Sequence, residues 1–344
     1  MNRILLVVAF FLFSLGQATA QNCSQTLRLA RSTYDQGRLH ELPELMKKCL
    51  ANTGIDGFTK QERVEAYKLL TMAFIYLEEP EKADSSMLLL LKTDPYFQLN
   101  KDVDPAEFIG LYNTFRTDPV YRIGIKAGAM ASQPNVASSN TANDGSSSYE
   151  NKIGILVGAF AEIPVLKKFI LNPELYFQSK TFGYNNSYSI ANTPATETQS
   201  WVSAPISLQY EFLREKFKDR KIKIMPYVSL GGQVDYLLSG SINVTTTKVE
   251  QLPVPSKSYT TSLSKLNLSA IISAGAKVKA GPGLLIAEVR YMYGLKNLLS
   301  PSDVYANQFT VFDNYIVPGI YKLNSFSITV GYAYNIFVPK KLKR

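Results

Sequence analysis

Residues Ser325 to Phe337 read Ser-Phe-Ser-Ile-Thr-Val-Gly-Tyr-Ala-Tyr-Asn-Ile-Phe, and their polarity alternates from one residue to the next. The even-numbered positions 326–336 carry only aromatic and aliphatic side chains, whereas the odd-numbered positions 325–335 carry only small or polar ones. Successive side chains of a strand point to opposite faces, so the pattern predicts a strand with one strongly apolar face. We expect this to be the closing strand of a β-barrel in a membrane.

The same two-residue period runs through the two thirds of the chain that follow Pro119. It predicts eight strands, most of them near or above the roughly ten residues that a tilted strand needs to cross a bilayer. The predicted strands are Tyr121–Met130, Lys152–Glu162, Phe169–Lys180, Trp201–Phe212, Lys221–Leu238, Lys265–Val278, Gly283–Leu295 and Ser325–Phe337.

The connections between these strands alternate in length. The long ones, rich in Ser, Thr, Asn and Pro, are Pro134–Tyr149, Thr181–Ser200, Ser239–Ser264 and Lys296–Asn324. The short ones are Ile163–Lys168, Leu213–Arg220 and Lys279–Pro282. An even number of strands, joined by short turns on one side and long loops on the other, is typical of a bacterial outer-membrane barrel. We therefore predict an α+β multidomain protein with an eight-stranded antiparallel transmembrane β-barrel at residues 119–338.

The polar face of the predicted strands carries charges of both signs. In a barrel of eight strands this face points into a narrow lumen, where an unpaired charge would be costly. A β-sandwich would instead need an apolar interior, so the pattern argues against one. We predict a lumen charge network made of Arg122, Lys126, Glu162, Glu174, Glu211, Asp235, Glu288 and Arg290.

Residues 1–20 predict a secretory signal peptide. Arg3 opens a basic segment, residues 4–15 form an apolar run, and Ala18-Thr19-Ala20 is a small-residue cleavage site. No later stretch has the about 18 consecutive apolar residues of a transmembrane helix. The chain has a formal net charge of +9, much of it in the short turns and in a basic tail at residues 339–344. Because an exported protein seldom meets nucleic acid, we expect no nucleic-acid partner. We expect a solvated basic rim, and the alternative is that lipid headgroups or an acidic partner meet it.

Residues 21–118 have helical spacing and predict a small periplasmic domain. The segments Thr59–Leu77 and Glu81–Leu91, with Pro95 beyond them, resemble a tetratricopeptide repeat, although Thr71 stands where that repeat usually has glycine or alanine. A last helix, Pro105–Arg116, is expected to have Asp104 as its N-cap. The alternative is a plain helical bundle without a partner.

The two cysteines, Cys23 and Cys49, fall near the start and the end of a predicted helical hairpin. Antiparallel helices bring these two positions together, so we predict a disulfide in the exported protein. A metal or catalytic role is disfavoured, because C-x-x-C spacing is absent and His40 is the only histidine.

The barrel segment, about Val120 to Phe337, resembles the PorT-like outer-membrane β-barrel family of Bacteroidota. The resemblance is carried by residues 172–177, 204–210, 226–232 and 288–295 and by the final strand. It implies an outer-membrane barrel and, since the family includes a secretion-associated member, a role in secretion as one option. In the final strand, Thr329, Gly331, Tyr334 and Ile336 resemble the signal that the barrel-assembly machinery recognises, although the chain continues beyond it.

No catalytic constellation is evident. Outer-membrane enzymes rely on a histidine with a serine or a carboxylate, and His40 lies in the predicted helical domain. Glu174 and Glu288 could form a glycosidase-like pair, but Arg290 and Lys126 favour a salt-bridge network. The sequence predicts no enzyme, no cofactor and no metal site.

We therefore expect a non-enzymatic outer-membrane protein that anchors a periplasmic protein-interaction domain, as an accessory of a secretion, transport or envelope-assembly complex. Its expected partners are outer-membrane lipid, the barrel-assembly machinery, and an envelope protein bound through residues 21–118. The alternative is a surface receptor or narrow pore that works through the long loops.

Overall fold

The computed structural model describes residues 20–138, 146–188, 191–214, 217, 222–244, 257–258, 263–299 and 319–342. The chain forms two compact units. The helical unit consists of Met1–Pro119 and Phe337–Arg344, and the barrel unit is Val120–Ile336. The predicted signal peptide lies outside the described residues except for its last position, Ala20.

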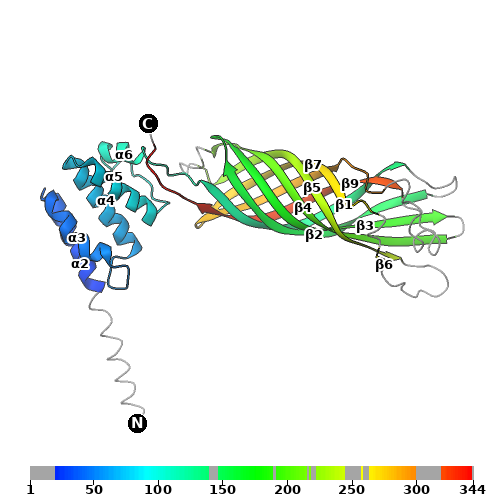
Figure 1. Ribbon diagram of the computed structural model, residues 1–344, viewed down its shortest axis with the longest axis horizontal. Coiled ribbons are helices and arrows are strands. Elements are labelled where there is room, and N and C mark those ends of the chain that lie inside the picture. The colour runs from blue at the N-terminus through cyan, green and yellow to red at the C-terminus, as the bar shows by residue number, and fades with distance from the viewer. Residues whose placement is uncertain are drawn as a thin grey trace, which may run out of the picture. The chain divides into compact units, whose positions relative to one another are not determined.

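The barrel unit is a closed antiparallel sheet (Figure 1). Each strand pairs with its neighbour along the chain, and β1 pairs with β9 from Tyr121↔Ile336 to Ser138↔Ile320. Its eight long strands are β1 (Tyr121–Ser138), β2 (Ser146–Pro164), β3 (Phe169–Tyr188), β4 (Ala191–Glu211), β5 (Ile224–Val244), β7 (Leu266–Ala280), β8 (Gly283–Gly294) and β9 (Ile320–Ile336). A two-residue strand, β6 (Lys257–Ser258), pairs with β5. The prediction of eight antiparallel strands is confirmed.

Several strands are longer than predicted at the end where the long connections lie, which we name the loop end. The expected loop Thr181–Ser200 is largely a continuation of β3 and β4, which pair as far as Tyr188↔Ala191. The prediction of a loop there was wrong because it relied on hydrophobic alternation. Backbone hydrogen bonds can extend a hairpin beyond the point at which its outer face stops being apolar.

The opposite end, which we name the turn end, holds the short connections β2–β3 and β7–β8. Between the two ends, outward-facing side chains form an apolar band around the barrel, and inward-facing ones are mostly polar and buried. The band includes Ile123, Ile125, Val157, Leu175, Phe177, Val202, Ile206, Leu208, Val228, Leu230, Val234, Leu268, Ile272, Leu285, Val289, Tyr291, Phe326, Ile328 and Val330, all at least one third exposed. An apolar outside around a polar inside is the arrangement expected of strands that face lipid.

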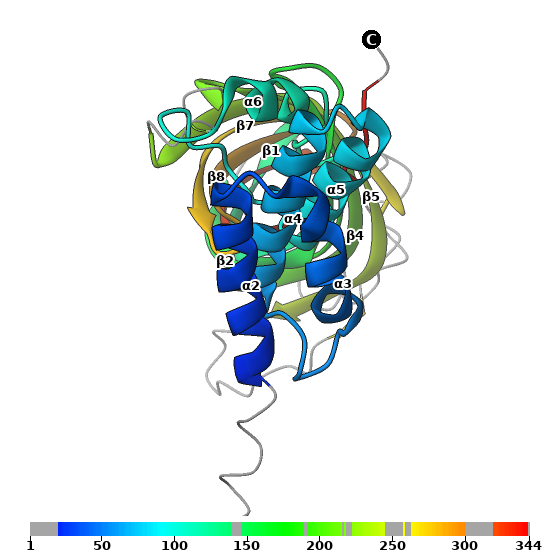
Figure 2. The ribbon, with the colours of Figure 1, turned by 90° about the vertical axis from the view of Figure 1, so that its left-hand side faces the viewer.

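The helical unit contains α2 (Ala20–Asp35), the 3-10 turn η1 (Leu39–Glu41), α3 (Leu42–Ala51), α4 (Lys60–Tyr76), α5 (Pro80–Thr93) and α6 (Ala106–Tyr112). Helix α2 packs on α3, and α4 packs on α5 (Figure 2). None of the described helices is both long enough and apolar enough to cross a membrane.

Local sequence signals explain several of these helix ends. Gly37 supplies the positive φ, 75°, that ends the first helix region. Thr59 and Glu62 form a capping box at the start of α4. Asp104 is not the N-cap of α6, contrary to the prediction, because Pro105 takes that position. The carboxylate of Asp104 is instead buried, where it pairs with Lys68 and accepts a hydrogen bond from the Asn100 amide.

Cys23 and Cys49 are joined by a disulfide, with their Cα atoms 5.7 Å apart. Both cysteines are buried in the same apolar cluster as Leu27 and Met46. The bond links α2 to α3 across a sequence separation of 26 residues.

The segment after β9 belongs to the helical unit. The Arg116 amide donates to the Lys340 carbonyl at 2.9 Å, and the Leu342 amide donates to the Thr114 carbonyl at 2.8 Å. Lys341 forms an ion pair with Asp84 on α5. Residues 337–342 are therefore a docked strand-like segment rather than a free basic extension, while residues 343–344 lie outside the described part of the chain.

We predict that replacing both cysteines, C23S/C49S, lowers the free energy of unfolding of the helical unit by about 3 kcal/mol, because the bond restricts the unfolded chain. Urea unfolding of the full chain, followed by far-UV circular dichroism, measures this change. Reduction of the wild type should reproduce it. An unfolding curve identical to that of the oxidised wild type would contradict the prediction.

Candidate functional site in the barrel lumen

Four charged side chains form a layer in the lumen near the turn end. Arg122 Nη1 lies 2.7 Å from a Glu162 oxygen and 3.1 Å from a Glu211 oxygen. Lys277 Nζ lies 2.5 Å and 2.8 Å from oxygens of the same two carboxylates. The four residues come from β1, β2, β4 and β7. Arg122 and Glu162 are cross-strand partners on neighbouring strands, whereas the other three ion pairs cross the lumen between strands that are not neighbours.

A second layer lies one step further along the strands. Lys126 contacts Glu174 at 2.9 Å and Glu288 at 3.3 Å, and Arg290 contacts the same carboxylates at 2.6 Å and 2.8 Å. The Tyr227 hydroxyl donates to Glu288 at 2.7 Å. Because both carboxylates are held by both cations, the structure favours the salt-bridge interpretation of Glu174 and Glu288 over a pair that is free for general acid–base chemistry.

Glycines on the inner face make room for these side chains. A Cβ atom at Gly124 would lie 2.5 Å from the ring of Phe160, which supports the Lys126 ammonium 4.6 Å from its centroid. A Cβ atom at Gly331 would lie 2.5 Å from Cγ of Lys126. Small residues at these two positions therefore allow the second layer to fill the lumen.

A third ion pair lies beyond an apolar layer that includes Met130 and Met292. Lys180 Nζ is 2.9 Å from a carboxylate oxygen of Asp235, and that carboxylate also accepts hydrogen bonds from Gln233 and Asn267. Lys180 and Asp235 are at most 1% exposed. The described side chains therefore shield this ion pair from solvent.

All eight residues of the predicted network are buried in the lumen and paired. Two further cations complete the network: Lys180, which the two-residue period also places on the polar face of its strand, and Lys277, which the prediction missed. The signal for Lys277 was present, because it shares the parity of Asn267, Ser269 and Ser273 in its strand. With these two included, each of the three layers contains as many lumen cations as carboxylates, and Arg214 at the turn end adds a further ion pair to Glu211 at 3.5 Å. This balance is what a desolvated lumen requires.

A different cluster fills the lumen at the loop end. It is mainly apolar and aromatic, and Glu197 is buried beside it. Its buried members are Phe182, Tyr184, Ala195, Trp201, Leu237, Ile242, Val244, Leu263, Leu298, Leu299, Tyr321 and Leu323. We call this set together with Glu197 and Gln199 the loop-end cluster.

Glu197 forms no ion pair with a described residue. Its carboxylate accepts a hydrogen bond from Gln199 at 2.5 Å and another from the Tyr321 hydroxyl at 3.2 Å. Glu197 lies five residues beyond Val202, the last residue of the apolar band on β4, which is roughly 16 Å further along the strand. Glu197 thus lies outside the apolar band, and the burial of its carboxylate raises its pKa to about 7 despite these two hydrogen bonds.

The four residues that resemble the assembly signal lie on β9 but do not form one surface. Thr329 faces the lumen, and Gly331 packs on Lys126. Tyr334 points outward and is 47% exposed, and Ile336 ends the strand at its pairing with Tyr121. Gly331 therefore has a packing role of its own, whatever machinery reads the strand.

A family model described as an outer membrane protein beta-barrel domain matches residues 120–300, more than half of the 344-residue chain. The chain belongs to this family. Its barrel unit is thus an outer-membrane barrel, which accounts for the apolar band and the filled lumen.

Solved structures of outer-membrane proteins are similar to the barrel. Neisserial surface protein A has 11% identity and a TM-score of 0.32, covering 63% of this chain and 97% of that one. OprG from Pseudomonas aeruginosa has 12% identity and a TM-score of 0.36, covering 64% and 98%. The outer membrane enzyme PagL has 12% identity and a TM-score of 0.25, covering 62% and 99%. No curated protein matches the chain. At these identities and TM-scores, the structural likenesses carry no argument about activity.

Breaking the third ion pair of this outer-membrane barrel should be strongly destabilising. We predict that Lys180→Met lowers the free energy of unfolding by about 3–5 kcal/mol, because it leaves Asp235 buried without a cation. Urea unfolding in detergent micelles, followed by fluorescence of the single tryptophan, Trp201, reports the change. The double variant K180M/D235L should recover most of the loss. A double variant as unstable as the single one would refute the pairing argument.

We also predict that the loop-end cluster is pH-sensitive. The folded-state pKa of Glu197 is raised above its ordinary value, so the packed cluster holds a proton that the opened cluster releases. Its stability is therefore greatest below about pH 4.5 and falls as the pH rises through about 7. The emission maximum of Trp201 should shift to the red above about pH 7. Glu197→Gln should abolish the shift, and an unchanged shift in that variant would exclude Glu197 as its source.

Proposed function

We propose that the protein is a non-enzymatic outer-membrane barrel that anchors a periplasmic protein-interaction domain. The observation that carries this proposal is that both ends of the barrel's chain enter the helical unit. The helical unit is followed by β1, and the segment after β9 returns to it. The helical unit is therefore held at the membrane by two covalent connections. One leads into β1 and the other leaves β9, the two paired strands that close the barrel.

The returning segment is integrated into the helical unit by several kinds of contact. It forms an antiparallel bridge between Phe115 and Lys341, and the Arg116 side chain donates to the Val338 carbonyl at 2.7 Å. The ring of Phe337 packs edge-on against Tyr96, with centroids 4.8 Å apart. Such contacts support an anchoring role, because a pull on the helical unit would be shared between two attachments.

The barrel itself suits an anchor better than a conduit or an enzyme. Its lumen is crossed by ion pairs in three layers, which supports a plug rather than a pore. His40, the one histidine of the chain, is exposed on η1 of the helical unit, so the lumen lacks the imidazole on which outer-membrane hydrolases rely.

The helical unit offers surface for a protein partner. Leu29 on α2, Tyr76 on α4 and Leu89 on α5 are between 42% and 51% exposed. The pairing of α4 with α5 supports a tetratricopeptide-like unit, in which Thr71 is buried and donates to the Tyr67 carbonyl. If the barrel belongs to the PorT-like group of this family, the partner would belong to a secretion, transport or envelope-assembly complex. Short turns on the periplasmic side would put the helical unit there as well.

A surface receptor is the second candidate. It is supported by the β3–β4 hairpin, whose pairing continues far beyond the apolar band to Tyr188↔Ala191. Strand pairing of that length would give the part of the hairpin beyond the band a fixed shape, which a receptor surface needs.

We predict that a photo-crosslinking residue at Leu29 or Tyr76 captures a defined envelope protein in living cells, whereas one at Thr181 on the outer face of β3 does not. In intact cells, protease should leave the helical unit uncut, and it should cut the unit after the outer membrane is permeabilised. Cleavage in intact cells would contradict the periplasmic location. Capture from Thr181 alone would favour the receptor.

A further inference from the structure

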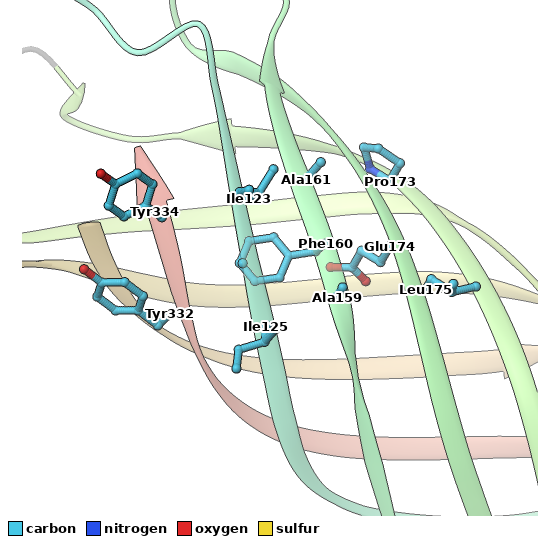
Figure 3. A pocket seen from close by; sticks show the side chains of 11 residues that line it. Ile123, Ile125, Ala159, Phe160, Ala161, Pro173, Glu174, Leu175, Tyr332 and Tyr334 are labelled. Carbon is cyan, nitrogen blue, oxygen red and sulfur yellow. The ribbon is translucent and has the colours of Figure 1, made fainter. Parts of the chain in front are cut away.

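A groove lies on the outer wall of the barrel, inside the apolar band and close to the turn end. Its volume is about 750 Å³, within the range of about 300–1,000 Å³ that is usual for ligand pockets. Figure 3 shows that its lining comes from four adjacent strands, β9, β1, β2 and β3. Only the carboxylate of Glu174 is charged, and it belongs to the buried second layer.

Small residues form the floor of this groove, and larger ones form its walls. Gly124, Ala159 and Ala161 leave the depression, which Tyr332 and Tyr334 border on one side and Pro173 and Leu175 on the other (Figure 3). The β2–β3 ladder lacks pairs beside Pro173, between Phe160↔Glu174 and Ile163↔Leu171, although the register is the same on both sides. A proline has no amide hydrogen to donate to the ladder.

The depth of the groove in the membrane follows from the aromatic residues next to it. At the turn end, the rings of Phe169 and Tyr210 pack edge-to-face with centroids 5.2 Å apart, and those of Tyr210 and Phe212 do so at 5.0 Å. Aromatic girdles mark the boundary between the acyl chains and the headgroups. The groove begins just inside this boundary, so acyl chains are what the bilayer offers at its level.

The turn between β2 and β3 adds a charged feature directly below the groove. Lys167 and Lys168 are exposed there, next to Val165 and Leu166, which are 58% and 63% exposed. Exposed apolar residues beside exposed lysines suit the headgroup level, where the ammonium groups meet lipid phosphate. Val165 is four residues from Ala161 along the chain, roughly 13 Å of extended strand. One lipid molecule can span this distance.

We propose that the groove is a binding site for one anionic glycerophospholipid of the leaflet at the turn end. One acyl chain lies along Ala159 and Ala161, between Tyr332 and Leu175. The phosphate is held by Lys167 and Lys168. Two features favour a phospholipid over lipid A as the occupant. The two lysines on a short turn match a single phosphate. The groove accommodates an acyl chain, but no polar groups that could bind a sugar line it.

The test is native mass spectrometry of the full chain in detergent, titrated with phosphatidylglycerol or with phosphatidylcholine. The wild type should retain one phosphatidylglycerol in a saturable way and bind phosphatidylcholine more weakly. Filling the floor with A159L/A161L should remove the saturable binding of both lipids. Removing the lysines with K167Q/K168Q should weaken phosphatidylglycerol binding by roughly 20- to 30-fold. It should weaken phosphatidylcholine binding much less, because the choline ammonium of that lipid already offsets the charge of its phosphate.

Matched controls separate the site from general effects. A129L/A287L places the same bulk on two exposed outward alanines that do not line the groove, and K47Q/K48Q removes two exposed lysines of the helical unit. Both controls should bind like the wild type. Heat-modifiable gel migration shows that each variant is folded, and the lysine pair still tests the site if A159L/A161L fails to fold.

Three results would overturn the proposal. The first is phosphatidylglycerol binding in A159L/A161L or K167Q/K168Q that is as tight as in the wild type. The second is an equal loss of binding in the control variants. The third is displacement of phosphatidylglycerol from the wild type by stoichiometric lipid A, or by a co-purifying protein, because the groove would then serve a different occupant.

Discussion

Charge pairing across the lumen is the constraint on which this barrel depends. A wall of eight strands encloses a space too narrow for bulk water, and the inner face of that wall carries charges. Each such charge would be costly alone, so Arg122 with Lys277, and Lys126 with Arg290, each bind a pair of carboxylates from distant strands. Several of these ion pairs, such as Lys277–Glu162 and Arg290–Glu174, tie together strands that share no backbone hydrogen bonds. Inner glycines, such as Gly124 and Gly331, are needed because the charged side chains must lie flat within this space.

The outer face of the barrel has the opposite requirement. It must be apolar to face lipid, and it tolerates irregularity only where backbone groups remain satisfied. Pro173 is such an irregularity, since it interrupts the β2–β3 ladder and borders a groove with a floor of small residues. The lysines of the adjacent turn lie where phosphate would be. A lipid seated there would cover this gap in the β2–β3 ladder.

The closing pair of strands also organises the helical unit. The helical segment leads into β1, and the segment after β9 returns to pair with residues 114–116. The barrel's closure and the attachment of the helical unit therefore depend on the same two strands. The disulfide between Cys23 and Cys49 reinforces that unit, in which α2 and α3 are joined by a short connection.

The sequence alone was sufficient to predict the eight strands, their antiparallel order and which face of each is inward, because a period of two leaves only one way to put an apolar face toward lipid. It also pointed to the buried residues of the charge network, since charges on that parity have nowhere else to lie. The strand ends could not be predicted in this way. Beyond Lys180 and before Trp201 the outer face is polar, so alternation vanishes although backbone pairing continues.

Contacts between residues distant in the chain were decided only by the tertiary structure. Strand register and curvature decide which carboxylate meets Lys126 and why Glu197 has no cation beside it among the described residues. They also decide why residues 337–342 dock on the helical unit. Local sequence contains neither quantity. Periodicity specifies the direction of a side chain, whereas its partner is set by the closure of the barrel, which brings positions up to about two hundred residues apart within a few ångströms of each other.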